Sequence, residues 1–170
     1  MHLDPERAAI RRADVTDLPD VEAVARTTWP VTYAGIIPDE VQRRLLDSWY
    51  SPGALRRALT AEGSTFLVAE WRGSVIGFAQ YVRRSAASVE LTRIYVVPDR
   101  QRSGIGTQLI EAGLATFAEE VLTRLTVSVE RENIVGRRFY ERMGFAELRE
   151  LRQEVQGHSL ELVEYHRPIP

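Results

Sequence analysis

Residues 93–107 read RIYVVPDRQRSGIGT and carry the most informative pattern in the chain. A run rich in β-branched residues stops at Pro98, a short polar and basic segment follows, and Gly104 and Gly106 lead into a helical pattern. A turn of this kind leaves several backbone N–H groups pointing at one spot, at the positive end of the helix dipole. The sequence therefore predicts an anion site, and phosphate is the usual occupant of such a site.

Two common phosphate-binding loops do not fit this stretch. A P-loop needs a Lys after its second glycine, and all 22 basic residues of the chain are Arg. A dinucleotide-binding fingerprint needs a third glycine where Leu109 stands. The phosphate must therefore be held in another way.

The pattern resembles the pyrophosphate-binding motif of the GNAT acyltransferases, Gln/Arg-x-x-Gly-x-Gly/Ala, which is read here from Gln101 through Gly104 to Gly106. The resemblance covers residues 90–147, where Asn133, Tyr140 and a closing 144–145 Gly-Phe pair follow in the order of that family. The glycine motif alone is a moderate signal, and the downstream block makes the resemblance specific.

Composition excludes several classes of function. The chain has 170 residues, 44% of them apolar, and a net charge of −2, which gives no support for binding nucleic acid. No apolar stretch approaches the length of a membrane span, and residues 1–7 have no signal-peptide core, so we expect a cytoplasmic protein. The absence of Cys and Lys excludes thiolate and Schiff-base chemistry, and the three scattered His residues predict no metal site.

Hydrophobic periodicity predicts the elements. Strands are expected over residues 9–11, 65–71, 75–82, 89–97 and 125–129, with two closing strands on either side of the 156–157 turn. Helices are expected from the 14–20 region up to a break at 29–38, from 39 through 46, from 52 to about 63, from 104 to about 121, and from 133 to 143. The order β-α-α-β-β-β-α-β-α-β-β predicts a single α/β (α+β) domain over residues 1–170, with helices on both faces of a mixed sheet.

The resemblance implies acetyl-CoA as co-substrate, bound where the fourth and fifth strands splay apart. The strand backbone would pair with the pantetheine, and residues 102–107 would form an N–H cradle in which a side chain at Gly104 or Gly106 would hold the backbone away from the phosphates. Arginines 100 and 102 would neutralise phosphate charge. The cofactor-binding residues expected on this basis are Ile94, Tyr95, Val96, Gln101, Arg102, Ser103, Gly104, Ile105, Gly106, Thr107, Asn133 and Arg137.

Helical spacing places Asn133, Gly136, Arg137 and Tyr140 on one face, which we expect to turn toward the cofactor gap. Asn133 is also explained by an N-cap role, and the two roles are compatible. Tyr140 is the predicted general acid, because a phenol keeps its proton at neutral pH and can give it to a departing thiolate. The alternative for Tyr140 is a core tyrosine packed among other aromatic rings.

The resemblance also points to Val96 as the backbone donor to the oxyanion and to Glu90 as the general base. A bulge is expected in the strand that carries Glu90, so the alternation of side chains does not settle whether Glu90 points into the cleft. The alternative for Glu90 is a solvated carboxylate at the strand edge. Some relatives place a Glu on the fifth strand, where this chain has Ser128. That departure counts against an N-terminal protein acetylase that uses such a base.

The resemblance implies that the first two helices and their connection form part of the wall around the acceptor. Trp29 and Tyr33 lie four residues apart and are candidates for an aromatic wall around a cationic amine, although such residues more often pack in the core. We expect a small-molecule amine (a polyamine, an amino sugar or an amino acid) rather than a protein terminus. The alternative from another class is an acyl-CoA-binding regulatory module without turnover. A homodimer is compatible with this fold, but no stripe in the sequence identifies an interface.

Overall fold

The computed structural model describes residues 7–170, in which seven strands form one sheet in the order β1-β2-β3-β4-β5-β7-β6. The strands are β1 (Ala9–Arg12), β2 (Ser64–Trp71), β3 (Ser74–Arg83), β4 (Ser88–Val96), β5 (Arg124–Glu130), β6 (Ala146–Val155) and β7 (His158–Pro168). The helices are α1 (Leu18–Thr32), α2 (Asp39–Trp49), α3 (Pro52–Thr60), α4 (Ile105–Thr116) and α5 (Ile134–Arg142), with 3-10 turns η1 (Val15–Asp17) and η2 (Pro98–Arg100).

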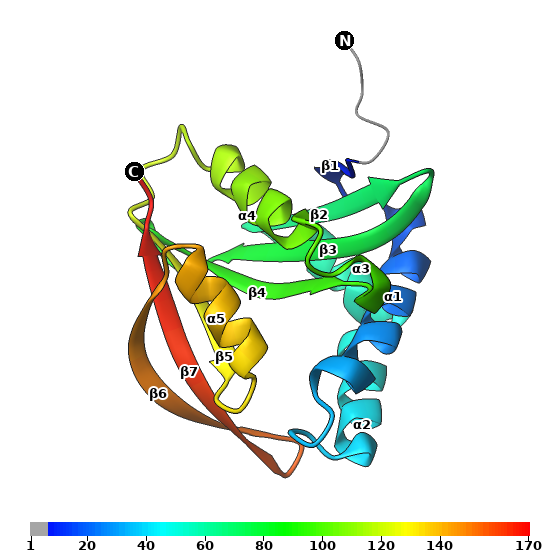
Figure 1. Ribbon diagram of the computed structural model, residues 1–170. Helices are drawn as coiled ribbons and strands as arrows, with labels where there is room; N and C mark the ends of the chain where they lie inside the picture. Colours follow the sequence, from blue (N-terminus) through cyan, green and yellow to red (C-terminus); the bar gives the residue numbers. More distant parts are fainter. Residues whose placement is uncertain (1–6) are drawn as a thin grey trace.

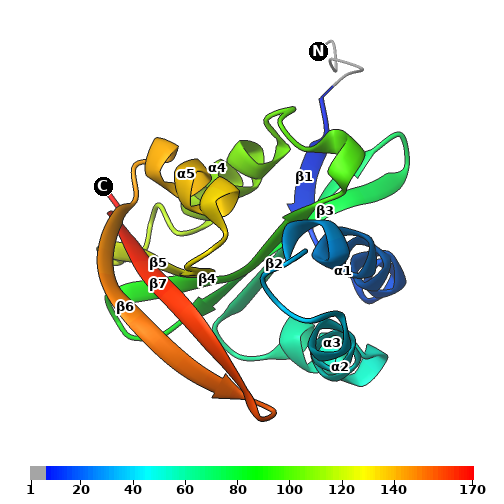
Figure 2. The same ribbon diagram turned by 60° about the horizontal axis from the view of Figure 1, so that its bottom comes forward.

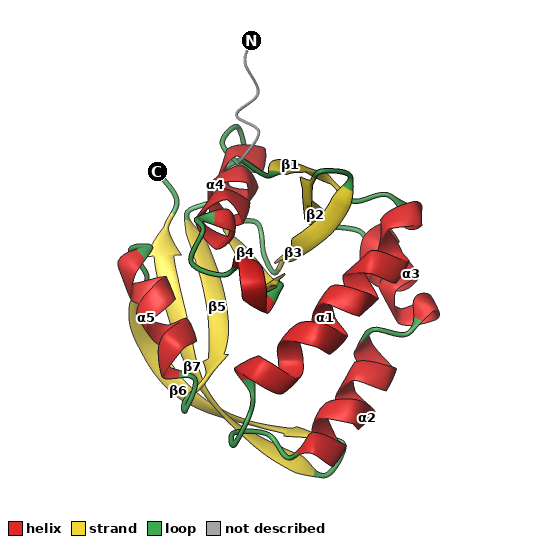
Figure 3. Cartoon of the chain, turned by 45° about the vertical axis from the view of Figure 1, so that its right-hand side comes forward, coloured by secondary structure: helices red, strands yellow, loops and turns green. Residues whose placement is uncertain are grey.

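The sheet separates two layers of helices (Figures 1 and 2). Helices α1, α2 and α3 cover one face, and α4 and α5 cover the other (Figure 3). A hydrophobic cluster lies on each side, one around Leu45 and Phe78 and the other around Leu109 and Tyr165. This arrangement confirms the predicted mixed sheet with helices on both faces.

Strands β4 and β5 pair in parallel over only part of their lengths. The pairs run from Ser88 with Arg124 to Leu91 with Val127. Both strands continue beyond these pairs, but their remaining residues do not pair with each other. The predicted splay between the fourth and fifth strands is therefore confirmed, and it leaves the second half of β4 with one free edge.

Strand β4 contains a bulge at Thr92. Gln80 of β3 pairs with Arg93 and the next residue, Tyr81, pairs with Leu91, so Thr92 has no partner in the β3–β4 ladder. The Thr92 hydroxyl donates to the Gln80 carbonyl at 3.2 Å. A bulge of this type shifts the alternation of side chains by one residue, and the sequence anticipates it in this strand.

Beyond the bulge, alternate residues of β4 face opposite layers. Arg93 and Tyr95 point to the α1–α3 side, where Arg93 stacks on Tyr50 and Tyr95 joins the aromatic cluster. Ile94 and Val96 point to the α4–α5 side and pack against its hydrophobic cluster. The second half of β4 therefore supplies side chains to both sides of the splay.

Two helix boundaries differ from those that the sequence predicts. Helix α1 runs through Pro30 to Thr32 instead of breaking at 29–30, because Trp29 is buried to 3% exposure and anchors the last turn while Pro30 removes a single intrahelical donor. Helix α4 ends at Thr116 rather than near residue 121, and Phe117 closes it. Residues 1–6, part of the segment for which the sequence predicts no leader, lie outside the described residues.

Candidate active site

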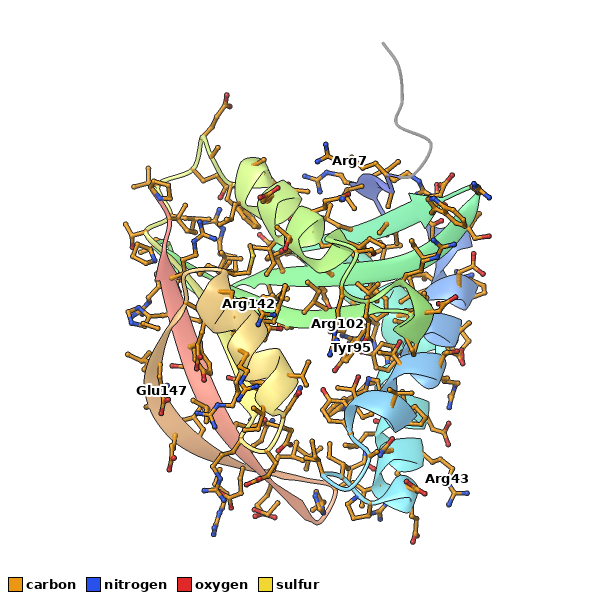
Figure 4. The ribbon with its side chains drawn as sticks, viewed as in Figure 1. Arg7, Arg43, Tyr95, Arg102, Arg142 and Glu147 are labelled. Carbon is orange, nitrogen blue, oxygen red and sulfur yellow. The ribbon has the colours of Figure 1, made fainter. Side chains whose placement is uncertain are left out.

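A cavity of about 890 Å³ lies where β4 and β5 part. Its walls come from both layers of the protein, so it passes through the splay from one face of the sheet to the other. We call its two ends the α5 side, lined by Gly104, Asn133 and Phe139 among others, and the α1 side, lined by Thr28, Thr32, Tyr33, Arg93 and Glu130 among others. Figure 4 shows Tyr95, Arg102 and Arg142 gathered around this central region, between α5 and α1.

The loop into α4 has the backbone geometry expected of the predicted anion cradle. Arg102 and Gly104 adopt positive φ angles of 64° and 83°, which turn the chain sharply into the helix. Within the described chain, the first backbone N–H to donate after Gln101 is that of Gln108, which bonds the Gly104 carbonyl at 3.0 Å. The N–H groups of residues 102–107 are thus free to bind an anion at the N-terminus of a twelve-residue helix.

Glycine is needed at the two positions of the motif for different structural reasons. A Cβ on Gly104 would meet nothing within 4 Å, so it would project into open space, and the positive φ at this position disfavours any side chain. A Cβ on Gly106 would lie 3.1 Å from Cζ of Phe139. Gly106 therefore permits close packing of α4 against α5, which corrects the expectation that both glycines serve the phosphates alone.

Four arginines line the cavity near the cradle. Arg100 and Arg102 come from the loop, and Arg138 and Arg142 come from α5. Within residues 7–170 none of the four forms an ion pair, while Arg100 stacks over the Trp71 ring at 3.7 Å. Arg138 and Arg142 were not among the residues predicted from the sequence, although their i, i+4 spacing on the helix after Asn133 was the available signal.

Helix α5 is rotated from the orientation that the sequence predicts. Asn133 caps the helix by accepting from the Gly136 N–H at 3.0 Å, and it also lines the cavity. Arg137 points away from the cavity: its Nε donates to the Tyr165 hydroxyl at 2.9 Å. Val135 lines the cavity and is 69% exposed. The structure therefore does not bring Arg137 to the cofactor gap, because β7 offers it a partner on the opposite side.

The free edge of β4 presents backbone groups to the splay. The Val97 N–H bonds the Ile76 carbonyl at 2.9 Å, and hydrogen-bonded pairs alternate along an antiparallel ladder, so the backbone groups of Tyr95 also face β3. Those of Ile94 and Val96 consequently face the gap. The Gln101 side chain donates its Nε2 proton to the Val96 carbonyl at 2.9 Å, which fixes the end of the strand beside the cradle.

Tyr140 lies at the bottom of the cavity on α5. It is 7% exposed, and its ring packs edge-on against Phe139 and Phe145 at centroid distances of 5.2 and 5.5 Å. Burial raises the pKa of the Tyr140 phenol well above its ordinary value, so the hydroxyl keeps its proton at neutral pH. Both interpretations of Tyr140 hold in geometry, since the ring belongs to an aromatic cluster and the residue also lines the cavity.

Glu90 lies outside the cavity. It stands before the bulge, in the part of β4 that still pairs with β5, and its partner across that pair is Thr126. Its carboxylate accepts from Nε of Arg84 in the adjacent turn. The structure therefore places the predicted base in a half-exposed ion pair away from the splay.

Glu130, which the sequence analysis did not single out, occupies the site instead. It is the last residue of β5, is 9% exposed, lines the cavity, and its Oε1 has no hydrogen-bond partner among the described residues. Burial, and secondarily the charge of Glu161, raises the pKa of Glu130 to about 7. It lies two residues beyond Ser128 on the same face of the strand, so the period of two was the available signal.

The two predicted acceptor-wall residues separate in the structure. Tyr33 lines the cavity, and its hydroxyl is 2.7 Å from that of Tyr95. Trp29 is buried beneath them, with its ring centroid 5.0 Å from that of Tyr33 and 5.9 Å from that of Trp49. Trp29 is therefore a support for the wall and does not reach the cavity, because its position on α1 faces the hydrophobic cluster.

The described residues contain neither a cluster of metal ligands nor a helix that could span a membrane. Within residues 7–170, no three His, Asp or Glu side chains come together in a way that could hold a metal ion. None of the helices in the described part is long and apolar enough to cross a bilayer.

Comparison with known proteins places this site in a family. The Acetyltransferase (GNAT) family matches residues 22–145. The chain is 30% identical over 140 residues to the spermidine N(1)-acetyltransferase of Thermoplasma acidophilum, a match that covers 80% of this chain and 86% of that protein. It is 28% identical over 131 residues to an uncharacterized N-acetyltransferase of Mycobacterium bovis, covering 77% and 84% of the two chains.

The structures agree with the sequences. The PaiA N-acetyltransferase of Thermoplasma acidophilum in complex with coenzyme A superposes with a TM-score of 0.78 at 27% identity, over 92% of this chain and 97% of that one. The free N–H cradle, the unpaired arginines around it and the open edge of β4 are the features that such a ligand requires. The chain therefore belongs to the GNAT family and is an acetyltransferase that uses CoA.

Proposed function

We propose that this protein transfers an acetyl group from acetyl-CoA directly to the primary amine of a small molecule. The observation that carries the proposal is the cavity itself, which joins an anion cradle on the α5 side to a buried, unpartnered carboxylate on the α1 side. Both substrates then meet in the splay, and the reaction needs no covalent enzyme intermediate. We take residues 1–170 as one catalytic domain.

The cofactor end follows from the free backbone donors. The N–H groups of residues 102–107 would hold the pyrophosphate, with Arg102, Arg138 and Arg142 supplying positive charge. The edge of β4 at Ile94 and Val96 would pair with the pantetheine. Asn133 would contact the cofactor while it caps α5, and Ser103 would hold the loop through its bond to the Arg100 carbonyl.

The protonation states of the ionisable groups in the cavity suggest which of them take part in the reaction. Acetyl-CoA, when bound, supplies the activated thioester carbonyl. Glu130 would take a proton from the acceptor's ammonium group and so generate the neutral amine that attacks, because a carboxylate with a pKa of about 7 is matched to that task at neutral pH. As the new C–N bond forms and the C–S bond breaks, Tyr140 would give its proton to the thiolate, and the Val96 N–H would stabilise the carbonyl oxygen.

A small-molecule acceptor is supported by the walls of the α1 side. The Tyr33–Tyr95 pair and the end of α1 enclose this part of the cavity. The spermidine N(1)-acetyltransferase relative acts on a small amine. A binding module without turnover would have no need for a buried carboxylate and a protonated phenol in the same cavity.

The function is tested by thiol release from acetyl-CoA with a panel of small amines, using the Tyr140→Phe variant beside the wild type. The substitution keeps the ring and its packing, so we expect unchanged CoA affinity and a fall in kcat of roughly 10²-fold, the scale of general acid catalysis. Tyr81→Phe removes a phenol hydroxyl that lies outside the cavity, where it donates to the Leu109 carbonyl, and serves as a control that the loss belongs to position 140. Wild-type binding of CoA without turnover on any amine would instead support the regulatory module.

The cofactor assignment of the α5 arginines is tested by calorimetry with CoA. Arg138→Gln and Arg142→Gln each remove one unpaired charge, so we expect about a 5-fold to 10-fold rise in Kd for each, the value of one partly exposed charge-assisted hydrogen bond. The Kd of either variant should also rise less steeply with salt than that of the wild type. Arg43→Gln on α2, which points away from the cavity in Figure 4, is the matched control. Wild-type affinity in both α5 variants would contradict the assignment.

A further inference from the structure

The charges that line the cavity are strongly unequal. Five arginines contribute to its walls, and Glu130 is the single carboxylate among the described lining residues. Four of the arginines lie around the cradle, where the phosphates of CoA would neutralise them. The charged groups left for the acceptor are therefore the negative carboxylate of Glu130 and the positive guanidinium of Arg93.

These two residues face the same side of the sheet. Glu130 pairs across the ladder with Leu162, which packs against the α1–α3 cluster, so its side chain points to that side. Arg93 points to the same side beyond the bulge, where its guanidinium lies 4.7 Å from the centroid of Tyr50. The guanidinium is thus carried by β4 and the carboxylate by β5, the two strands that splay apart, and both residues line the α1 side of the cavity.

Arg93 keeps free donors for a ligand. Its only hydrogen bond within the described residues runs from one terminal nitrogen to the Trp49 carbonyl at 3.1 Å, and no carboxylate pairs with it. A guanidinium has five N–H donors, so this bond and the stacking on Tyr50 fix its orientation while leaving most donors unused. A half-buried, oriented and unpaired guanidinium is suited to hold a carboxylate by two parallel bonds.

We infer that the acceptor is an amine that also carries an anionic group, of the amino-acid type, with its amine toward Glu130 and its anion toward Arg93. This inference rests on the proposed function and selects among its acceptors. A polyamine would bring several positive charges into the site. The lining offers one carboxylate to pair with them, and the unpaired guanidinium of Arg93 on the same side would repel them. A zwitterion pairs with both, and its net charge adds nothing to the cost of burial.

The test compares amines that differ only in the carboxylate. Wild-type kcat/KM is measured for ornithine against putrescine, arginine against agmatine, and phenylalanine against phenethylamine, with spermidine as the polycation. We expect at least one amino acid to exceed its decarboxylated partner by roughly 100-fold, because the decarboxylated amine cannot form the bidentate bonds to Arg93 and leaves its donors unpaired. Faster turnover of spermidine or of the decarboxylated amines overturns the inference while leaving the proposed function intact.

Variants of Arg93 separate recognition from packing. Arg93→Gln should lower the ratio of amino-acid to amine kcat/KM by at least about 10-fold, mainly through KM, and Arg93→Lys should retain part of the ratio because it keeps the charge. A merely structural arginine would change both members of each pair equally and leave the ratio at its wild-type value. Arg43→Gln controls for loss of a surface charge.

A binding measurement keeps the inference testable without turnover. Calorimetric titration of the protein saturated with CoA should give tighter binding for the amino acid than for its decarboxylated amine. Equal affinities for every pair would overturn the acceptor class. Failure to bind CoA, or saturation with CoA but no turnover with any amine, would instead count against the proposed function.

Discussion

The Gly104→Val variant is expected to lose CoA binding almost completely, with a rise in Kd of more than about 100-fold, because a helix N-terminus binds phosphate only when its N–H groups can approach it. A Cβ on Gly104 would meet nothing within 4 Å, and Gly104 lines the cavity, so we expect the added side chain to occupy space that the phosphates need. Isothermal titration with CoA measures the loss directly. Unchanged affinity would show that the phosphates bind elsewhere.

A matched control separates the cradle from backbone strain. Gly157, in the turn between β6 and β7, has a φ of 78°, close to the 83° of Gly104, and it also has nothing within 4 Å of its missing Cβ. Valine at either position should therefore cost a similar amount of stability, about 1–2 kcal/mol for an L residue in the left-handed region. We expect both variants to melt at similarly lowered Tm values and only Gly104→Val to lose CoA.

The Glu130→Gln variant is expected to lower kcat/KM by roughly 10²- to 10³-fold at neutral pH, the range for removal of a general base. In the wild type the rate should rise with pH through about 7, because Glu130 must lose its proton before it can accept one. In the variant this rise should be absent. Glu132→Gln removes an exposed carboxylate two residues away and should leave the profile unchanged. An identical profile in Glu130→Gln would move the base to a water chain or another group.

The same substitution should make the protein more stable at alkaline pH. Burial raises the pKa of Glu130 from 4.5 to about 7, so between these values the folded protein holds a proton that the unfolded chain has released. The free energy of unfolding therefore falls as pH rises through this window, by at most about 3 kcal/mol, and glutamine removes that fall. Tm measured on the acid and the alkaline side of this window for both proteins checks the sign. A better folded and less active variant would show that the acid is kept for its chemistry.

Local patterns were enough to predict the turn into α4 and most of the helices and strands. The Pro98 strand end and the glycines that follow fix a turn within a few residues, and the Asn133 cap fixes the start of α5 in the same way. The splay and the bulge follow from the family resemblance, and the structure has both. The turn and the cap could be predicted because they depend on residues that are close together in the sequence.

The side chains that face the splay could not be read in the same way. Glu90 was favoured because it lies in a strand that resembles those of relatives, but whether it faces the cavity depends on which residue carries the bulge, and that residue is Thr92. Glu130 was missed because its isolation is a property of the folded state: nothing within the sequence says that its Oε1 finds no donor. Arg137 was misplaced because its hydrogen-bond partner in the folded chain, Tyr165, belongs to a strand that is distant in sequence.

The bulge at Thr92 also bears on how such an enzyme changes its substrate. Beyond it, the side chains of residues 93 and 95 face the α1 side of the cavity and those of residues 94 and 96 face the α5 side. On the proposed function, residues 93 and 95 can therefore change to accept a new amine while residues 94 and 96 continue to serve an unchanged donor. Loss of the one extra residue would reverse this assignment along the whole half-strand, so divergence of acceptors within a common scaffold depends on keeping the length of β4 constant.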